Sequence, residues 1–342
     1  MPPAVENIEP GPLPLGLDSR SLRRRALQIA AVLVIVGLGA ALAPGLGDLR
    51  QRLQGAHPGW LGVALVLELL SCLSYVLMFR PIFSARMSLR TSYRLGMSQL
   101  AVGSLVPASG AAGLAFGAWA LRKRGMAVHE IARRTVAFFA LKSAVNFIAV
   151  SVVGLAMWFG VGPQVSPALT LLPAVLAMAA IAAVSLIPFI HARRGWTSRT
   201  AVALGEGIGE AVRLLARRDW RVIAGSAGYW AFDNAVLWAC LHAFGETPPL
   251  TLVLMGYLIG QLGGLLPLPG GLGGIDGGLL GALVVYGIPA TAAAAAIVAY
   301  RLILFWLPLV LGGAAFASLR KGLHYVERLD LCEASPHPQI AS

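Results

Sequence analysis

Long apolar stretches recur along this sequence, and they limit its fold more than any other feature. An α-helix needs roughly 20 apolar residues to cross the hydrocarbon core of a membrane. Charged residues make up 12% of the chain, about half their usual share in a soluble domain, too few to coat a globule of this size. We therefore predict an all-α polytopic membrane protein. The uninterrupted stretches predict six full spans, at about 26–43, 58–79, 135–159, 168–190, 222–244 and 292–318.

The first stretch also resembles a signal peptide, because Arg23–Arg25 precede it and it ends in Ala41-Leu42-Ala43. Two features favour its retention as a span. The apolar run is about 18 residues long, which exceeds a usual signal-peptide core, and Pro44 would follow the cleavage site directly.

Two further apolar stretches, 95–121 and 250–287, are each interrupted by a break rich in Gly and Pro, at 107–113 and 267–274. Proline cannot donate a backbone hydrogen bond and clashes with the preceding turn. Each glycine weakens a helix by about 1 kcal/mol. A helix should therefore end at each break and restart after it, near Ala111 and Ile275. The arms are too short for ordinary spans, so we predict two re-entrant hairpins of half-helices. Two short, tilted spans per stretch are the alternative.

The basic residues support this layout. With the N-terminus inside, 23 of the 27 Lys and Arg residues lie in segments that face the cytoplasm. Arg50 and Arg52 fall outside, and Lys142 and Arg301 fall within spans. This asymmetry also explains the net charge of +12, because a basic inner face suits anionic lipid headgroups. Nucleic acid is not needed to explain it, and both termini are predicted to be cytoplasmic.

The two breaks are related by a constant offset of 162 residues, which carries Pro107 to Pro269, Leu121 to Leu283 and Gly125 to Gly287. Each half of the chain then contains two spans, a hairpin and a third span. Three crossings are an odd number, so the second half would be inverted relative to the first. We predict an inverted repeat whose hairpin tips meet near the middle of the bilayer, an arrangement typical of transporters. Chance alignment of glycine-rich sequences is the alternative.

The restarted half-helices predict a polar binding site at the tips. The N-terminus of a helix presents unpaired N–H groups and the positive end of its dipole, which suit an anion such as phosphate. Small and Pro residues at the breaks would let a headgroup approach the backbone, although glycines also serve close helix packing. The candidate binding residues at the breaks are Pro107, Ser109, Gly110, Pro269, Gly270, Gly271 and Gly273.

Five ionisable residues at membrane depth complete the candidate site: Glu68, Lys142, Asp233, Asp276 and Arg301. Each costs about 2.5–3.5 kcal/mol at the centre of a helix on insertion scales, so pairing or function must offset it. Arg301 is the strongest functional candidate, bound to phosphate or paired with Asp233 or Asp276. Helix capping alone could explain Asp276, and Glu68 and Lys142 could form a structural pair. The six His are scattered, and no metal, cofactor or catalytic set is predicted.

One family matches these residues. The segment 269–276, followed by Tyr300-Arg301-Leu302 and Leu307-Pro308, resembles the flippase-like transmembrane domain of lysylphosphatidylglycerol synthases. The resemblance extends over roughly 25–325. The first half departs from the family pattern, because it lacks the acidic residue expected near Gly113 and the Glu-Arg pair of the following span. The resemblance implies movement of a lipid between leaflets. Only some 20 residues follow position 320, so the aminoacyl-transferring domain, and lipid aminoacylation, are not expected.

We therefore expect a stand-alone lipid flippase of the bacterial inner membrane, not an enzyme. Its substrate would be an anionic or aminoacylated lipid, or one of polyprenyl or hopanoid type. A homo-oligomer and a lipid-synthesis enzyme are left open as partners. The expected parts are tails at 1–25 and 319–342 and a membrane domain at 26–318, with repeats at about 26–159 and 168–318.

Two other functions fit the same features. One is a proton-coupled transporter of a small soluble anion, which would need a closed aqueous vestibule instead of a lateral opening to lipid. The other is a non-transporting scaffold for lipid-modifying enzymes.

Overall fold

The computed structural model describes residues 53–84, 87–105, 111–162, 166–194, 199–262 and 274–323, with the single positions 24, 27 and 51. The predicted span at 26–43 and the centres of both breaks lie outside these residues. Within them the chain is helical, without strands. The helices are α3 (Pro58–Phe83), α4 (Leu89–Leu105), α5 (Ala111–Lys123), α6 (Val128–Trp158), α7 (Pro167–Arg194), α8 (Arg199–Ala216), α9 (Trp220–Ala243), α10 (Leu250–Leu262), α11 (Gly274–Val285) and α12 (Ala290–Leu323).

Four of the described helices are long enough and apolar enough to cross a membrane: α3, α6, α7 and α12. Large apolar side chains on them face outward; for example, Val152 on α6 and Leu176 on α7 are about 60% exposed. Such an apolar exterior suits lipid tails. The protein is therefore a multi-pass α-helical membrane protein. The 24-residue α9 matches the predicted span at 222–244 but is less apolar, because it carries Asp233 and Asn234.

The five predicted spans that lie within the described residues coincide with α3, α6, α7, α9 and α12, and several of these helices are longer than predicted. α6 begins at Val128, seven residues before the predicted start, and α3 continues through Pro81 to Phe83. No helix was predicted in the segment between the fourth and fifth predicted spans, and the structure corrects this. That segment contains α8, an amphipathic helix that packs on α6 and α7. The helix was missed because its apolar face is too narrow to resemble a membrane span.

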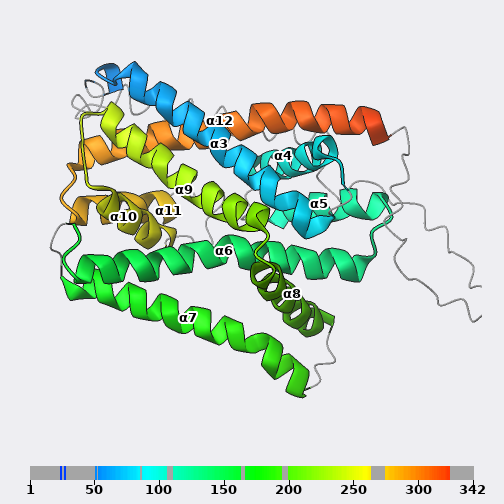
Figure 1. Cartoon of the computed structure of the whole chain (residues 1–342). Helices are drawn as coiled ribbons and strands as arrows, with labels where there is room; N and C mark the ends of the chain where they lie inside the picture. Colours follow the sequence, from blue (N-terminus) through cyan, green and yellow to red (C-terminus); the bar gives the residue numbers. More distant parts are fainter. Residues whose placement is uncertain are drawn as a thin grey trace, which may run out of the picture.

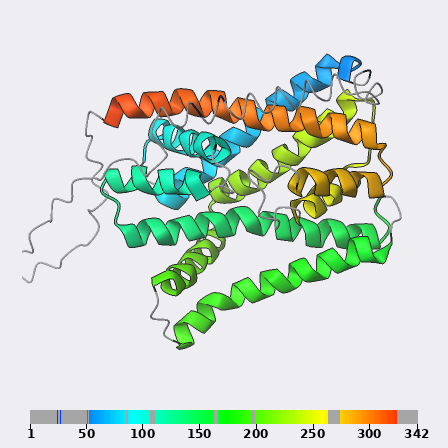
Figure 2. The ribbon, with the colours of Figure 1, turned by 180° about the vertical axis from the view of Figure 1, so that it is seen from behind.

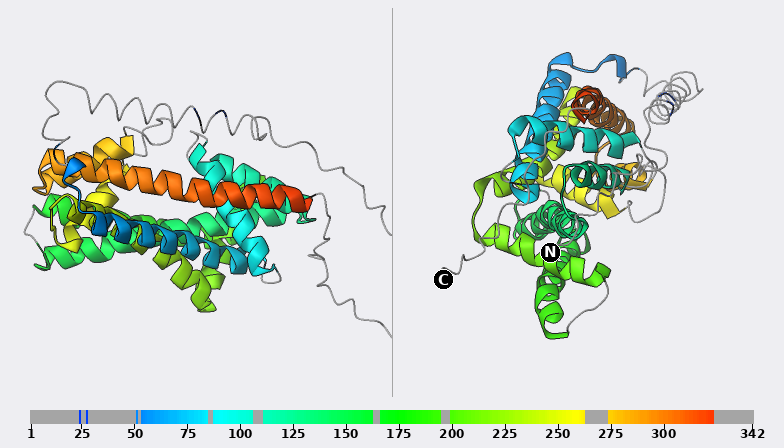
Figure 3. Two further views of the ribbon diagram at one scale, coloured as in Figure 1. Left: turned by 90° about the horizontal axis from the view of Figure 1, so that it is seen from above. Right: turned by 90° about the vertical axis from the view of Figure 1, so that its right-hand side faces the viewer.

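The long helices run side by side, with α3 and α12 on one side of the bundle and α7 on the opposite side (Figures 1 and 3). The most extensive contact joins α3 and α9, which cross the middle of the bundle. The core contains two large apolar clusters. One surrounds Met255 and Leu283, and the other surrounds Phe79, Phe116 and Phe138.

Two short helical hairpins occupy opposite halves of the bundle, α4–α5 beside the C-terminal half of α12 and α10–α11 beside its N-terminal half (Figures 1 and 2). α5 begins at Ala111 and α11 at Gly274, as the breaks predicted. Three of the four arms have 12 or 13 residues, about 18–20 Å of helix, against a hydrocarbon core of about 30 Å.

Glycines bring the arms of each hairpin together. A Cβ on Gly113 would lie 3.2 Å from the Cα of Gly103, and one on Gly117 would meet the Gln99 side chain. In the second hairpin a Cβ on Gly260 would lie 2.8 Å from the Cα of Leu279, and one on Gly256 would meet Leu283. In each hairpin, the glycine that is later in the sequence on one arm contacts a residue that is earlier on the other arm. The two arms of each hairpin are therefore antiparallel.

Both hairpins end in the same glycine cap. Gly125 and Gly287 have φ values of 86° and 92°, which glycine adopts without steric cost. The N–H groups of Gly125 and Met126 donate to the carbonyls of Arg122 and Leu121, and those of Gly287 and Ile288 donate to the equivalent carbonyls of the second hairpin. This bonding closes the last turn of a helix. α6 and α9 end in the same way, at Gly160 and Gly245.

Side chains satisfy backbone groups that would otherwise lack a partner within the membrane. Pro173 inside α7 cannot donate to the carbonyl of Leu169, and the hydroxyl of Tyr286 donates to that carbonyl instead, at 3.3 Å. At the end of α3, Arg134 from α6 donates to the carbonyl of Phe83. Such substitutes are needed because water does not reach these groups in lipid.

Gly312 should be indispensable for packing α12 against α4. A Cβ at this position would meet the carbonyl oxygen of Met97 and the side chain of Ala101, whereas a Cβ on Gly313 would meet nothing within 4 Å. We predict that Gly312→Ala lowers stability by about 1–3 kcal/mol through overpacking, and that Gly313→Ala does not. Thermal unfolding in detergent, followed by size-exclusion chromatography, compares the two variants. Equal behaviour of both would contradict the close packing.

Candidate functional site

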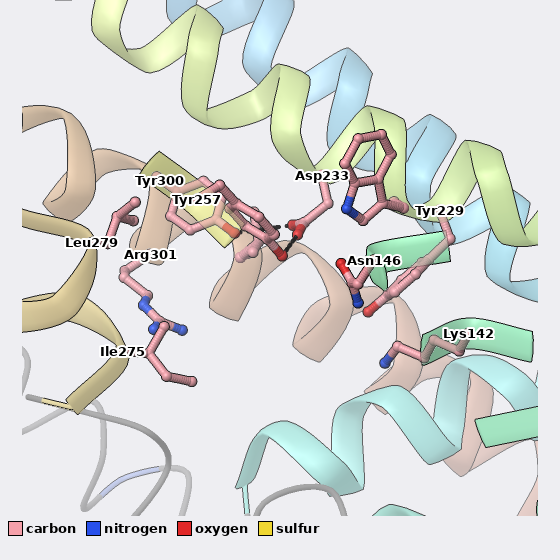
Figure 4. Close-up of a pocket in the computed structure, with 11 residues that line it drawn as sticks. Lys142, Asn146, Tyr229, Asp233, Tyr257, Ile275, Leu279, Tyr300 and Arg301 are labelled. Carbon is pink, nitrogen blue, oxygen red and sulfur yellow. Dashed lines mark hydrogen bonds between the residues drawn. The ribbon is translucent and has the colours of Figure 1, made fainter. Parts of the chain in front are cut away.

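A cavity of about 260 Å³ lies among α6, α9, α10, α11 and α12 (Figure 4). Its walls are polar and aromatic on most sides. Apolar side chains of α11 and α12 form the remaining wall. The lining residues are Lys142, Asn146, Tyr229, Trp230, Asp233, Tyr257, Ile275, Leu279, Tyr300, Arg301 and Leu304.

Asp233 is the central acidic group of the cavity, and its side chain is fixed by two tyrosines. Tyr257 donates its hydroxyl hydrogen bond to Oδ2, and Tyr300 donates to Oδ1 at 3.2 Å. Asp233 is only 9% exposed. Hydrogen bonds to an ionised group are among the stronger ones in proteins, so α10 and α12 together hold this α9 carboxylate in place.

Two cationic side chains lie on opposite sides of Asp233 (Figure 4). Arg301 donates from Nε to Oδ1 of Asp276, which joins α12 to the first turn of α11. The two terminal nitrogens of Arg301 make no hydrogen bond to the described residues. Lys142 lies with Nζ 4.7 Å from the ring centre of Tyr229, and no described carboxylate lies within ion-pair distance of it. Among the described residues, the terminal nitrogens of Arg301 and Nζ of Lys142 are therefore hydrogen-bond donors available at the two ends of the cavity.

Further polar atoms at the cavity lack partners. Oδ1 of Asn146 and Nε1 of Trp230 are buried, and neither has a hydrogen bond to the described residues. A buried polar atom without a partner costs about 1–3 kcal/mol, so each indicates a place for a ligand atom or water. The opposite wall, formed by Ile275, Leu279 and Leu304, is apolar. The cavity can therefore accommodate a guest with a charged and an apolar part.

The structure brings four of the predicted site residues together. Lys142, Asp233 and Arg301 line the cavity, and Asp276 pairs with Arg301 beside it. Glu68 on α3 does not line it but lies close enough to interact electrostatically with Asp233. The predicted residues at the two breaks, which comprise Pro107, Ser109, Gly110, Pro269, Gly270, Gly271 and Gly273, lie outside the described residues.

One pairing prediction was wrong. The described residues show no ion pair between Glu68 and Lys142. Glu68 accepts a hydrogen bond from the thiol of Cys72 at 3.6 Å, while Lys142 lies over Tyr229. Two charges on neighbouring membrane helices suggested a pair, but their positions along α3 and α6 place them against different neighbours.

Most of the uncharged side chains that line the cavity were not predicted from the sequence. Asn146 is four residues after Lys142 and therefore lies on the same face of α6. Tyr300 directly precedes Arg301. Polar atoms in apolar segments were the available signal, but Tyr and Trp are also common in membrane helices at the interfaces. In the described ranges, no three His, Cys, Asp or Glu side chains gather closely enough to hold a metal ion.

Comparisons with known proteins match nearly the whole chain. The family described as "Lysylphosphatidylglycerol synthase TM region" matches residues 28–312. A "UPF0104 membrane protein" of Methanothermobacter thermautotrophicus is 27% identical over 337 residues, which cover 86% of this chain and 92% of the relative. A second protein of that name and organism is 24% identical and covers 83% of this chain and 94% of its own length.

The Arg301–Asp276 pair should couple α11 to α12 energetically. Each side chain is less than a third exposed, at 28% and 22%. Removing one partner leaves the other charge unpaired, so we predict that Arg301→Ala and Asp276→Ala together destabilise less than the sum of the single variants. The expected coupling is about 0.5–3 kcal/mol. Thermal unfolding of the four proteins in lipid nanodiscs measures it, and additive effects would show that the pair contributes nothing.

Proposed function

We propose, from the premise that this chain belongs to the lysylphosphatidylglycerol synthase TM-region family, that it moves a lipid between the leaflets of the membrane. The observation that carries the proposal is a cavity lined by two cationic side chains, Lys142 and Arg301, inside a multi-pass membrane protein. The lipid would bear an anionic group; anionic, aminoacylated, polyprenyl and hopanoid-type lipids all remain candidates. We propose transport, not catalysis, for this chain.

The chemistry of the cavity supports a lipid headgroup as its guest. A phosphate could accept hydrogen bonds from the terminal nitrogens of Arg301 and from Lys142, and such charge-assisted bonds are strong. Trp230 would supply a further donor, and Asn146 would accept from a hydroxyl or ammonium group. The apolar wall of α11 and α12 would contact the glycerol or the first part of the acyl chains.

An inverted repeat, with the two hairpins re-entering the membrane from opposite sides, is part of the proposal. Three observations support it. The hairpins occupy opposite halves of the bundle (Figure 1). α4 of the first hairpin packs on α12, while α10 of the second packs on α6. The bonds that end α5 and α11 also recur at the same offset of 162 residues. Rocking of one repeat against the other would then expose the cavity to each side in turn.

The orientation that we propose places both termini in the cytoplasm of a bacterial cell and the protein in its inner membrane. The connections at 122–124 and 217–221 are basic, and both lie away from the end of the bundle at which α9 leads to α10 (Figure 1). At that end, the described connections that follow α3 in the sequence contain no Lys or Arg, and Glu246 is their one acidic residue. This bias is the one that sets topology in membrane proteins.

A soluble anion and a scaffold role are the competing hypotheses. The same cations would bind glycerol phosphate without its acyl chains, so the two transport hypotheses share a cavity and differ in the route to it. Competition by a soluble headgroup therefore separates them. A scaffold would need no cationic cavity. Substituting the cationic residues of the cavity would then leave lipid movement unaffected.

Replacing either cavity cation should slow lipid movement. We predict that Arg301→Gln and Lys142→Met reduce the rate by about tenfold or more, because each removes a charged hydrogen-bond donor worth about 1.5–3 kcal/mol. The assay uses proteoliposomes of phosphatidylcholine with a trace of fluorescent phosphatidylglycerol, and quenching from outside reports how much has crossed. Lys142→Met breaks no ion pair, so it separates loss of function from loss of folding.

The exposed Arg217→Gln is the matched control, because it removes a positive charge away from the cavity. It should transport normally. Unchanged rates in both cavity variants would refute the proposal. Uptake of soluble glycerol phosphate without any lipid movement would favour transport of a soluble anion. If neither the parent protein nor any variant moves lipid or glycerol phosphate, the scaffold role would be favoured.

A further inference from the structure

Glu68 is a buried carboxyl group that the proposed headgroup contacts do not use. It lies near the middle of α3 and is 3% exposed. It interacts electrostatically with Asp233 of α9, which lines the cavity. Its Oε1 accepts a hydrogen bond from the Cys72 thiol at 3.6 Å. Its Oε2 is buried without a partner among the described residues.

The surroundings of Glu68 differ sharply from those of Asp233. Asp233 accepts from two tyrosine hydroxyls and is near both cations, Lys142 and Arg301. Glu68 has only a thiol, which is a weak donor, and none of the ion pairs of the described residues includes it. Asp233 therefore has partners that would stabilise its ionised form, whereas an ionised Glu68 would be an almost unsolvated anion.

The titratable groups that face Glu68 come from three helices. Cys72 is on α3 itself, Tyr229 and Asp233 are on α9, and Tyr300 is on α12. The cations Lys142 of α6 and Arg301 of α12 act on Asp233. Among the described residues, α4 contributes no group that interacts with Glu68. Among the described residues, the charged side chain that acts on Glu68 is thus a second carboxylate, Asp233, which repels an ionised Glu68.

Counting charges shows what ionisation of Glu68 would do to the cavity. If Lys142 and Arg301 are charged and Asp233 and Asp276 are ionised, the formal charges of these four groups cancel while Glu68 holds a proton. When Glu68 loses its proton, the same region carries a net negative charge and repels an anion. In a medium of low dielectric constant this repulsion is weakly screened. The protonation of Glu68 and the occupation of the cavity by an anion should therefore be linked.

We propose that Glu68 is a proton-binding site, and that its proton is required for tight binding of an anionic headgroup in the cavity. The coupling rests on the proposed function, whereas the proton site itself rests only on the burial and the partners of Glu68. Anion binding favours retention of the proton, and a proton on Glu68 favours the anion. The reaction is simple proton transfer between water and the Glu68 carboxylate, and no other bond changes.

Infrared spectroscopy of the protein in phosphatidylcholine nanodiscs tests the proton site without any ligand. A protonated carboxyl group has a carbonyl-stretch band that disappears when the group ionises. We expect the parent protein to show such a band, which weakens as the buffer is made alkaline. Glu68→Gln should lack the band. Glu206→Gln, a charge-matched change on the exposed side of α8, should retain it. Asp233→Asn should also retain it. A band that persists in Glu68→Gln, or no titrating band in the parent protein, would overturn the site.

Binding of short-chain phosphatidylglycerol tests the coupling. For the parent protein and Glu206→Gln, affinity should fall with increasing pH by up to about tenfold per unit, the limit for one linked proton. Glu68→Gln should bind at every pH with the affinity that the parent protein has in acid. An equal pH dependence of affinity in the parent protein and in Glu68→Gln would overturn the coupling and leave the proposed function intact. No binding at any pH would overturn the proposed function and the coupling, while the infrared band would still decide the proton site.

Discussion

A charge inside a membrane protein must be paired, hydrogen-bonded or neutralised, and this constraint organises the centre of the molecule. Asp233 is held by two tyrosine hydroxyls, and Arg301 is held by Asp276. Lys142 rests against an aromatic ring. The partners come from α6, α9, α10, α11 and α12, so five helices converge on one polar cavity. Groups that this network leaves unsatisfied are the ones available to a ligand or a proton.

The fold creates this polar centre by keeping short helices inside a bundle of long ones. α11 begins at Gly274 and brings Asp276, in its first turn, to Arg301 of α12. A continuous helix through the break at 267–274 would carry that residue elsewhere. Glycines at 113, 117, 256 and 260 hold the arms of each hairpin in close contact. Glycines of the arms therefore serve close helix packing.

Sequence patterns predicted the helices well because membrane spans depend on local composition. The starts of α5 and α11 were predicted because Pro and Gly act on their own turn of helix. The partners of the charged residues were harder to predict. Arg301 was expected to pair with Asp233 or Asp276, and only the packing of α11 against α12 decides between them. Tyr257 was missed because a tyrosine in an apolar helix gives no sign that its hydroxyl faces a carboxylate on the preceding helix. α8 was missed because amphipathic connecting segments lack the length signal of a span.

An experimental structure of the protein in nanodiscs rich in phosphatidylglycerol would test the central claim most directly. The claim is that the cavity around Asp233 holds the anionic group of a lipid between Lys142 and Arg301. We expect density for a phosphate in contact with both cations, with its acyl chains leaving along the apolar wall. A cavity that contains only water, with lipid confined to the outer surface of the helices, would contradict the account.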